Sequence, residues 1–222
     1  MSDRDYTKSE SFARNGADLP EDLERASDVR RLFAEREVDV SELLVRGVKL
    51  DSGDLDRLRL ECCVLEDLAA PETAIRTAKW KDVRFSACDL SNVEIRALTA
   101  VRVELLECRM TGFRCGEAEW RDVLFSGGDQ RYAQFRFSSF RSSEFDGCNF
   151  EDSDFYGADL QGCVFRRCNL RNVEMSKANL AGADFRGSKI EGWRLQAEDV
   201  RGAIVDAAQA LQLAPLLGIH IL

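Results

Sequence analysis

The sequence predicts an all-β solenoid, a parallel coil with four short sides per turn and a short helix covering each end. Three observations lead to this fold class. Large apolar residues recur at every fifth position, small residues recur two positions before them, and glycines occur at the positions between one pair and the next. A period of five fits neither the 3.6-residue turn of a helix nor the two-residue repeat of a strand. The backbone must therefore alternate between a short extended side and a corner.

The large positions are the multiples of five. From Leu50 to Val200 there are 31 of them, and 27 hold Leu, Ile, Val, Phe, Met or Trp. The exceptions are Ala70, Ala100, Cys115 and Gln130. The position two residues before each is small, with Ala, Cys, Ser, Thr, Val or Gly in 25 of 31 cases. Residues two apart on an extended segment share a face, so both series point inward.

The remaining two residues of each five must turn the chain. Freedom in φ is useful there, and six glycines occupy such positions: Gly112, Gly147, Gly157, Gly162, Gly182 and Gly187. Four corners close a coil of about twenty residues, and coils about 4.8 Å apart satisfy each other's backbone hydrogen bonds. Residues twenty apart should then stack in columns. One such column is Phe85, Leu105, Phe125, Phe145, Phe165 and Phe185.

Three runs carry a resemblance to a known family: A-D-L-Q-G at 158–162, A-N-L-A-G at 178–182 and A-D-F-R-G at 183–187. They resemble the repeat of pentapeptide-repeat proteins, which implies a right-handed quadrilateral β-helix over residues 38–205. The quinolone-resistance members resemble this chain more distantly. In that branch a DNA-like, negatively charged rod occupies the DNA site of gyrase, so DNA gyrase or another type II topoisomerase is one implied partner.

Each end of such a coil exposes an apolar cross-section and needs a cap. The acidic first turn and apolar residues of Pro20–Glu35 predict a helix over the first coil. Asp206 is a good N-cap for a helix over Ala207–Leu217, which Gly218 would end. We therefore expect three parts: a tail and capping helix at 1–37, the β-helix at 38–205, and a C-terminal cap at 206–222.

The C-terminal segment carries more apolar residues than one helix face needs. The surplus residues are candidates for a homodimer contact across a two-fold axis: Leu213, Leu216, Leu217, Ile219 and Ile221. In the quinolone-resistance members that the chain resembles, a C-terminal element also joins two protomers. Capping alone and capping with dimerisation both stay open at this stage.

Eight cysteines suggest a disulfide framework or a zinc site. Six of them occupy small inward positions, where Cys acts as a compact hydrophobe: Cys63, Cys88, Cys108, Cys148, Cys163 and Cys168. Stacked neighbours would lie within disulfide reach, so a redox-sensitive ladder is the alternative to reduced core thiols. We expect reduced thiols. No CxxC pair exists and His220 is the only histidine, so we expect no metal. Cys62 should point outward.

Other chemistry finds little support. A catalytic arrangement with histidine could only be built around His220, and no phosphate-binding loop is present, so we expect no enzyme and no cofactor. The net charge of −9 disfavours direct nucleic-acid binding. The N-terminus lacks the apolar run of a signal peptide, and no stretch reaches the roughly 20 apolar residues of a membrane span, so we expect a cytoplasmic protein.

One irregularity is a candidate partner contact: Asp129, Gln130, Arg131 and Tyr132. Here Gln130 takes a large inward position and Gly128 the small one. Either Gln130 hydrogen-bonds to the coil backbone, or this side bulges and exposes the four residues. Taken together, the sequence favours a protein-binding or scaffolding module without catalytic activity. A DNA-mimicking modulator or protector of gyrase is the alternative.

Overall fold

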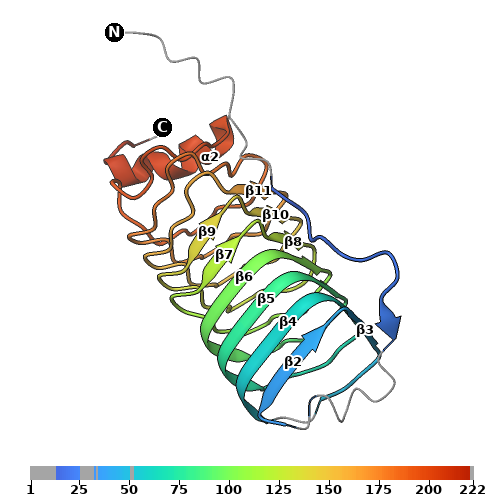
Figure 1. Ribbon diagram of the computed structural model, residues 1–222. Coiled ribbons are helices and arrows are strands. Elements are labelled where there is room, and N and C mark those ends of the chain that lie inside the picture. The colour runs from blue at the N-terminus through green and yellow to red at the C-terminus, as the bar shows by residue number, and fades with distance from the viewer. Residues whose placement is uncertain (1–13, 26–32, 34, 51–52, 221–222) are drawn as a thin grey trace.

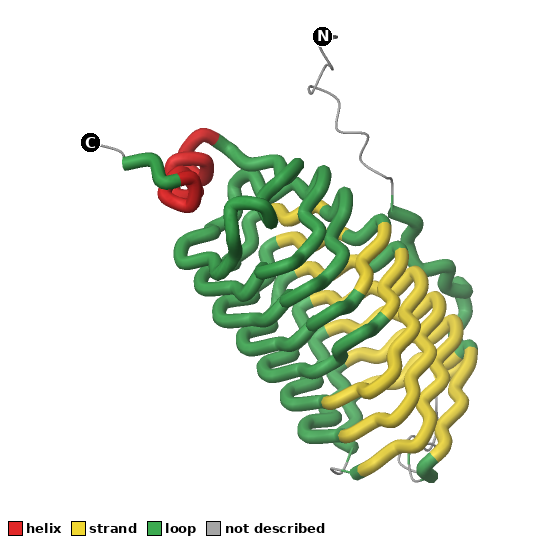
Figure 2. The backbone as a smooth tube through the Cα atoms, turned by 90° about the vertical axis from the view of Figure 1, so that its left-hand side faces the viewer, coloured by secondary structure: helices red, strands yellow, loops and turns green. Residues whose placement is uncertain are grey.

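The computed structural model describes residues 14–25, 33, 35–50 and 53–220, and most of them form a four-sided parallel β-helix (Figure 1). All strand pairs are parallel, so each coil lies on the one before it. The strands shorten toward the C-terminal end, where turns and loops make up most of each coil (Figure 2). Their bounds are β1 Glu24–Arg25, β2 Glu37–Ser41, β3 Leu43–Arg46, β4 Asp54–Glu66, β5 Ala74–Ser86, β6 Glu94–Leu106, β7 Glu119–Arg121, β8 Leu124–Ser126, β9 Ser139–Arg141, β10 Glu144–Asp146 and β11 Val164–Arg166.

The register between coils is twenty residues, which confirms the predicted columns. Phe125 pairs with Phe145, and Phe145 pairs with Phe165. The rings of Phe145 and Phe165 stack with centroids 4.3 Å apart, and Phe165 stacks on Phe185 at 4.8 Å. Because these rings are buried inside the coil, the core is a continuous column of side chains along the axis of the β-helix.

Most corners place their second residue in the left-handed region of φ, including all six predicted glycines. The corner column that contains Arg57, Thr77 and Ala97 is different. These three residues lie outside the left-handed region, and β4, β5 and β6 run unbroken across the corner. At Glu117 and Phe137, in the same column, φ becomes positive again. The shape of this edge therefore changes along the β-helix.

The first part of the predicted N-terminal helix is not helical. Residues 20–25 are not helical, and Glu24–Arg25 instead form β1, which pairs with Leu43 and Leu44 of β3. The helix expected over Pro20–Glu35 is therefore wrong in this part, because the segment extends the sheet rather than crossing its end. Residues 26–32 and 34 lie outside the described residues. Phe33 does pack against the core of the first coils.

Residues 14–18 form a strap along the outside of the β-helix (Figure 1). The backbone amide of Ala17 donates to Glu104 Oε1 at 3.4 Å, and that of Asp18 donates to Asp82 Oδ1 at 3.0 Å. The amide of Asn15 donates to Asp122 Oδ1 at 3.2 Å. Three carboxylates on successive coils thus hold the strap by its main chain.

The C-terminal cap confirms the prediction. Helix α2 spans Ala207–Leu213 and continues as the 3₁₀ helix η1 over Ala214–Leu217, and Gly218 ends it with φ 72°. Asp206 is the N-cap and forms a capping box with Gln209. Gln209 is buried, and its Nε2 donates to the carbonyls of Phe185 and Ser188, both at 2.7 Å. The helix is therefore attached to the last coil by hydrogen bonds.

Candidate interaction surfaces

Many outward arginines pair with carboxylates on neighbouring coils. Arg57 contacts Glu37 at 2.6 Å, and Lys81 contacts Glu61 at 2.6 Å. Further pairs twenty residues apart are Arg84–Glu104, Arg102–Asp82, Arg114–Glu94, Arg171–Glu191 and Arg194–Glu174. Exposed pairs of this kind contribute little to stability. Their effect on recognition is larger, because positive and negative charges alternate along these columns.

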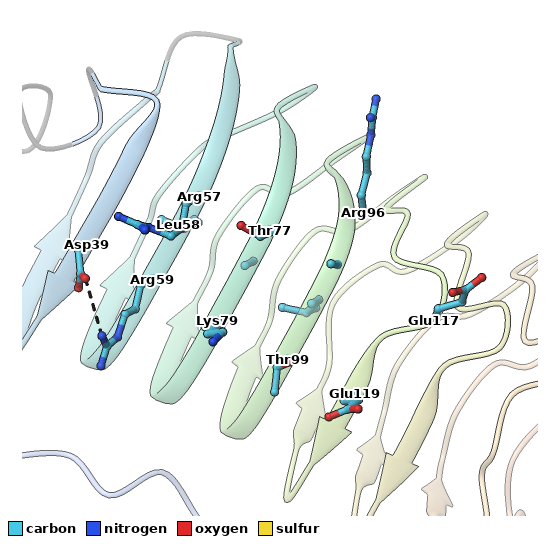
Figure 3. A pocket seen from close by; sticks show the side chains of 13 residues that line it. Asp39, Arg57, Leu58, Arg59, Thr77, Lys79, Arg96, Thr99, Glu117 and Glu119 are labelled. Carbon is cyan, nitrogen blue, oxygen red and sulfur yellow. Dashed lines mark ion pairs between the residues drawn. The ribbon is translucent and has the colours of Figure 1, made fainter.

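A groove of about 520 Å³ lies over β4, β5 and β6, at the corner that lacks positive φ (Figure 3). Its floor consists of small outward residues: Thr77, Ala97 and Thr99. Four basic residues also line it: Arg57, Arg59, Lys79 and Arg96. Figure 3 shows Asp39 at one end, beside Arg59, and Glu117 and Glu119 at the other end. The groove is thus basic along its middle and acidic at its ends.

The next three coils carry an aromatic cluster on their surface, formed by Arg136 and Phe137, Tyr156, and Lys177. Phe137 is 54% exposed, and its ring meets the edge of Tyr156 with centroids 5.4 Å apart. The Arg136 guanidinium and the Lys177 ammonium lie 4.9 and 5.2 Å from the Tyr156 ring centroid, within cation–π distance. The cluster is therefore held in place by contacts among its own members.

Gly157 makes room for this arrangement. A Cβ atom on Gly157 would lie 2.6 Å from Cδ1 of Phe137, so the phenyl ring rests directly on the glycine backbone. Sequence reasoning missed the cluster. The available signal was that Phe137 takes a corner position, where its side chain cannot reach the core.

The candidate contact at 129–132 divides between the core and the surface. Gln130 is fully buried, and its Nε2 donates to the carbonyls of Gly127 at 3.1 Å and Cys108 at 3.3 Å. The first of the two alternatives, hydrogen bonding to the coil backbone, therefore describes Gln130. Tyr132 is 55% exposed. A partner contact through this segment stays a prediction.

Asp129 and Arg131 pair on the surface beside Tyr132. The Arg131 guanidinium approaches the Asp129 carboxylate to 2.7 Å, and this hydrogen bond holds the pKa of Asp129 below its usual value despite partial burial. Tyr132 and Phe137 occupy the corners at the two ends of the side formed by 133–135. One coil thus presents two exposed aromatic rings that flank the same side.

The C-terminal candidates differ in exposure. Leu213 is half-buried and packs against the core, whereas Leu216, Leu217 and Ile219 are exposed. Ile221 lies outside the described residues. The structure therefore leaves part of the predicted dimer contact on the surface, and dimerisation itself stays a prediction.

The thiols are mostly core residues. All eight cysteines are free, seven are buried and Cys62 is half-buried. Burial raises the pKa of Cys115 and of Cys163 well above the ordinary value, so these thiols stay protonated and unreactive at neutral pH. In the described part of the chain no group of three or more His, Cys, Asp or Glu residues could hold a metal ion. Among the same residues, no helix is both long and apolar enough to cross a bilayer.

Comparisons with known proteins give a family and several structural relatives. The family model of the pentapeptide repeat region matches residues 78–151 and 138–203, which together cover more than half of the chain. No curated protein matches the chain.

Among solved structures, a trypsin-treated form of QnrB1, described as a plasmid-mediated fluoroquinolone resistance protein, is 22% identical with a TM-score of 0.42, covering 90% of this chain and 95% of its own. HetL from Nostoc sp. strain PCC 7120, a pentapeptide-repeat protein involved in heterocyst differentiation regulation, is 18% identical with a TM-score of 0.33, covering 81% and 94%. The pentapeptide-repeat protein Rfr23 from Cyanothece 51142 is 12% identical with a TM-score of 0.31, covering 81% and 97%.

Proposed function

The chain belongs to the pentapeptide-repeat family, and from this premise we propose that it is a non-catalytic protein that binds a protein partner in the cytoplasm. The observation that carries the proposal is the ring pair formed by the exposed Phe137 and the half-buried Tyr156. It lies on a surface whose other outward side chains are mostly charged or small. Aromatic residues and Arg dominate the energetics of protein interfaces, and here both are fixed on a rigid coil. Tyr132, at the other end of the same side, extends the proposed contact.

The test is affinity capture with quantitative mass spectrometry from a lysate of the source organism. The full chain is compared with Phe137→Ala and Tyr156→Ala, and with Leu211→Ala as a control for loss of another exposed apolar side chain. We expect a partner that the wild type and the control retain and both ring variants lose. Equal recovery by all four folded proteins would remove this surface as the contact.

The alternative partner is DNA gyrase or another type II topoisomerase, bound by mimicry of DNA. The net charge of −9 supports it, whereas the alternating charges along the outward columns weigh against it, because DNA presents charges of one sign. A supercoiling assay with and without a fluoroquinolone decides the question. Inhibition or protection at micromolar protein supports this alternative, and no effect of folded protein excludes it.

We also propose that two chains associate through the C-terminal segment. The support is the exposure of Leu216, Leu217 and Ile219 next to the capping helix, where a cap for one coil would need only a single apolar face.

A further inference from the structure

The groove over β4–β6 has a local structural cause. At most corners the second residue has positive φ and the chain turns sharply, but at Arg57, Thr77 and Ala97 the strands continue through the corner. The outward residues at the centre of this stretch are short, so the strand backbone forms an open floor. Because the corner turns sharply again at Glu117, the groove ends there. The corner without positive φ is a feature of three successive coils.

The basic residues of the groove are only partly neutralised. Arg57 contacts Glu37 at 2.6 Å, and Arg59 contacts Glu61 at 2.7 Å and Asp39 at 3.9 Å. Arg96 reaches Glu94 only at 3.8 Å. Lys79 lies between these residues and forms no ion pair within the described part of the chain. The side chains of Arg57 and Arg59 are about half exposed. The groove can therefore accept further negative charge.

The length of the groove limits the kind of ligand. Its lining runs from Asp39 to Glu119 along one outward column, which is four steps between coils, or about 19 Å at the spacing of parallel strands. An extended peptide advances about 3.3 Å per residue, so about six residues fill this length.

We propose that this groove binds an extended acidic segment of the protein partner, with two or more carboxylates facing Arg57, Arg59, Lys79 and Arg96. This inference rests on the proposed function, because it names the chemistry of the partner. Phe137 follows Glu117 in the same corner column. A segment leaving the groove therefore passes the acidic end and then the aromatic cluster. A partner segment that complements this surface therefore carries acidic residues in the groove, a basic residue at the acidic end, and an apolar residue at the aromatic cluster.

A single-stranded nucleic acid is the other extended anion that a basic groove could take. It fits less well, because Asp39, Glu117 and Glu119 close the groove at both ends with negative charge, which a continuous phosphate backbone would have to cross. A peptide can change the sign of its charge from one residue to the next.

The experiment selects random twelve-residue peptides displayed on phage against the full chain. We expect the enriched peptides to carry two or more Asp or Glu residues within about six consecutive positions. The strongest peptide is then measured by fluorescence polarisation. Its affinity should fall about tenfold in Lys79→Glu and in Ala97→Arg, and by less than about twofold in Arg109→Glu, the matched charge reversal on the opposite side of the coil.

Ala97→Arg separates a fit to the groove from general attraction, because it adds a positive charge while filling the floor. Tighter binding in this variant would overturn the proposal, as would enriched peptides without acidic residues or no enrichment over a blank matrix. Equal affinity for a single-stranded oligonucleotide, lost in Lys79→Glu, would favour nucleic acid instead. If Phe137→Ala loses the captured partner and Ala97→Arg retains it, the proposed function stands and the groove assignment fails.

Discussion

Gly128 and Gln130 show how an irregular pair is accommodated inside a strict repeat. The neighbouring coils place Cys108 and Met110, and Cys148 and Phe150, at the same positions. A Cβ atom on Gly128 would lie 2.1 Å from the Cys108 carbonyl oxygen and 2.9 Å from Nε2 of Gln130. The amide of Gln130 therefore uses space that a larger residue at 128 would need. The Gln130 Oε1 atom is buried without a hydrogen-bond partner, so only the amide nitrogen of this side chain has its hydrogen bonds.

We predict that Gly128→Ala destabilises the protein and that Gln130→Met partly corrects the defect. The single variant should lower the free energy of unfolding by about 2–4 kcal/mol, because φ at 128 is +81° and the added methyl meets the backbone of the coil below. In the double variant the pair resembles Cys108 and Met110, so the backbone at 128 can leave the left-handed region, which Cys108 does not occupy. Urea unfolding of both single variants and the double variant gives the coupling, which we expect to be about 1 kcal/mol or more. Simple additivity would contradict it.

At the scale of elements, the strap depends on buried carboxylates. Asp82 accepts hydrogen bonds from Arg102 Nε and Nη2, both at 2.6 Å, and from the amide of Asp18. Burial opposes ionisation of Asp82, but the hydrogen bonds from Arg102 and Asp18 outweigh it and hold the pKa of this carboxyl below its usual value. Glu104 behaves in the same way: burial opposes ionisation, and Arg84 and the amide of Ala17 lower its pKa.

We predict that acid releases the strap. Because the pKa of Asp82 is lower in the folded protein than in the unfolded chain, its contribution is complete above the unfolded value of about 4 and is lost as the pH falls through the folded value. The protection of the amides of Ala17 and Asp18 against hydrogen exchange, measured relative to their intrinsic rates at each pH, should therefore decrease in acid. Asp82→Asn should exchange faster at neutral pH and show a smaller stability change with pH. A variant with the wild-type pH dependence would contradict this account.

We predict that Gln209 joins the C-terminal helix to the last coil. Gln209→Ala leaves the carbonyls of Phe185 and Ser188 without their side-chain donor, which should cost about 1–3 kcal/mol. Gln212→Ala removes the same side chain from an exposed position of the same helix and should change stability by less than about 0.5 kcal/mol. Chemical denaturation measures the difference. Equal effects of the two variants would mean that the helix is held by its apolar contacts alone.

At the scale of the whole molecule, sequence predicts what repeats and misses what depends on main-chain geometry. Side-chain size at the multiples of five was enough to give the coil, its twenty-residue register and the Phe145–Phe165 column. The strap could not be predicted, because it is held by the amides of Asn15, Ala17 and Asp18, and every residue type offers an amide. The groove could not be predicted either, because it follows from φ at one corner column. The aromatic cluster was visible in the sequence only as a phenylalanine, Phe137, at a corner position instead of a multiple of five.

The last prediction concerns assembly. If two chains associate through the C-terminal segment, light scattering should give a mass twice the 25.0 kDa of one chain. Leu217→Arg and Ile219→Arg together should restore the single-chain mass, because they place charges in a desolvated contact, whereas Tyr132→Arg, on an exposed corner of the coil, should not. Since all three side chains are exposed in one chain, none of these changes disturbs the core, and circular dichroism should match the wild type. If the wild-type protein has the mass of a single chain at all concentrations, the homodimer is excluded. Leu216, Leu217 and Ile219 would then form only the outer edge of the cap.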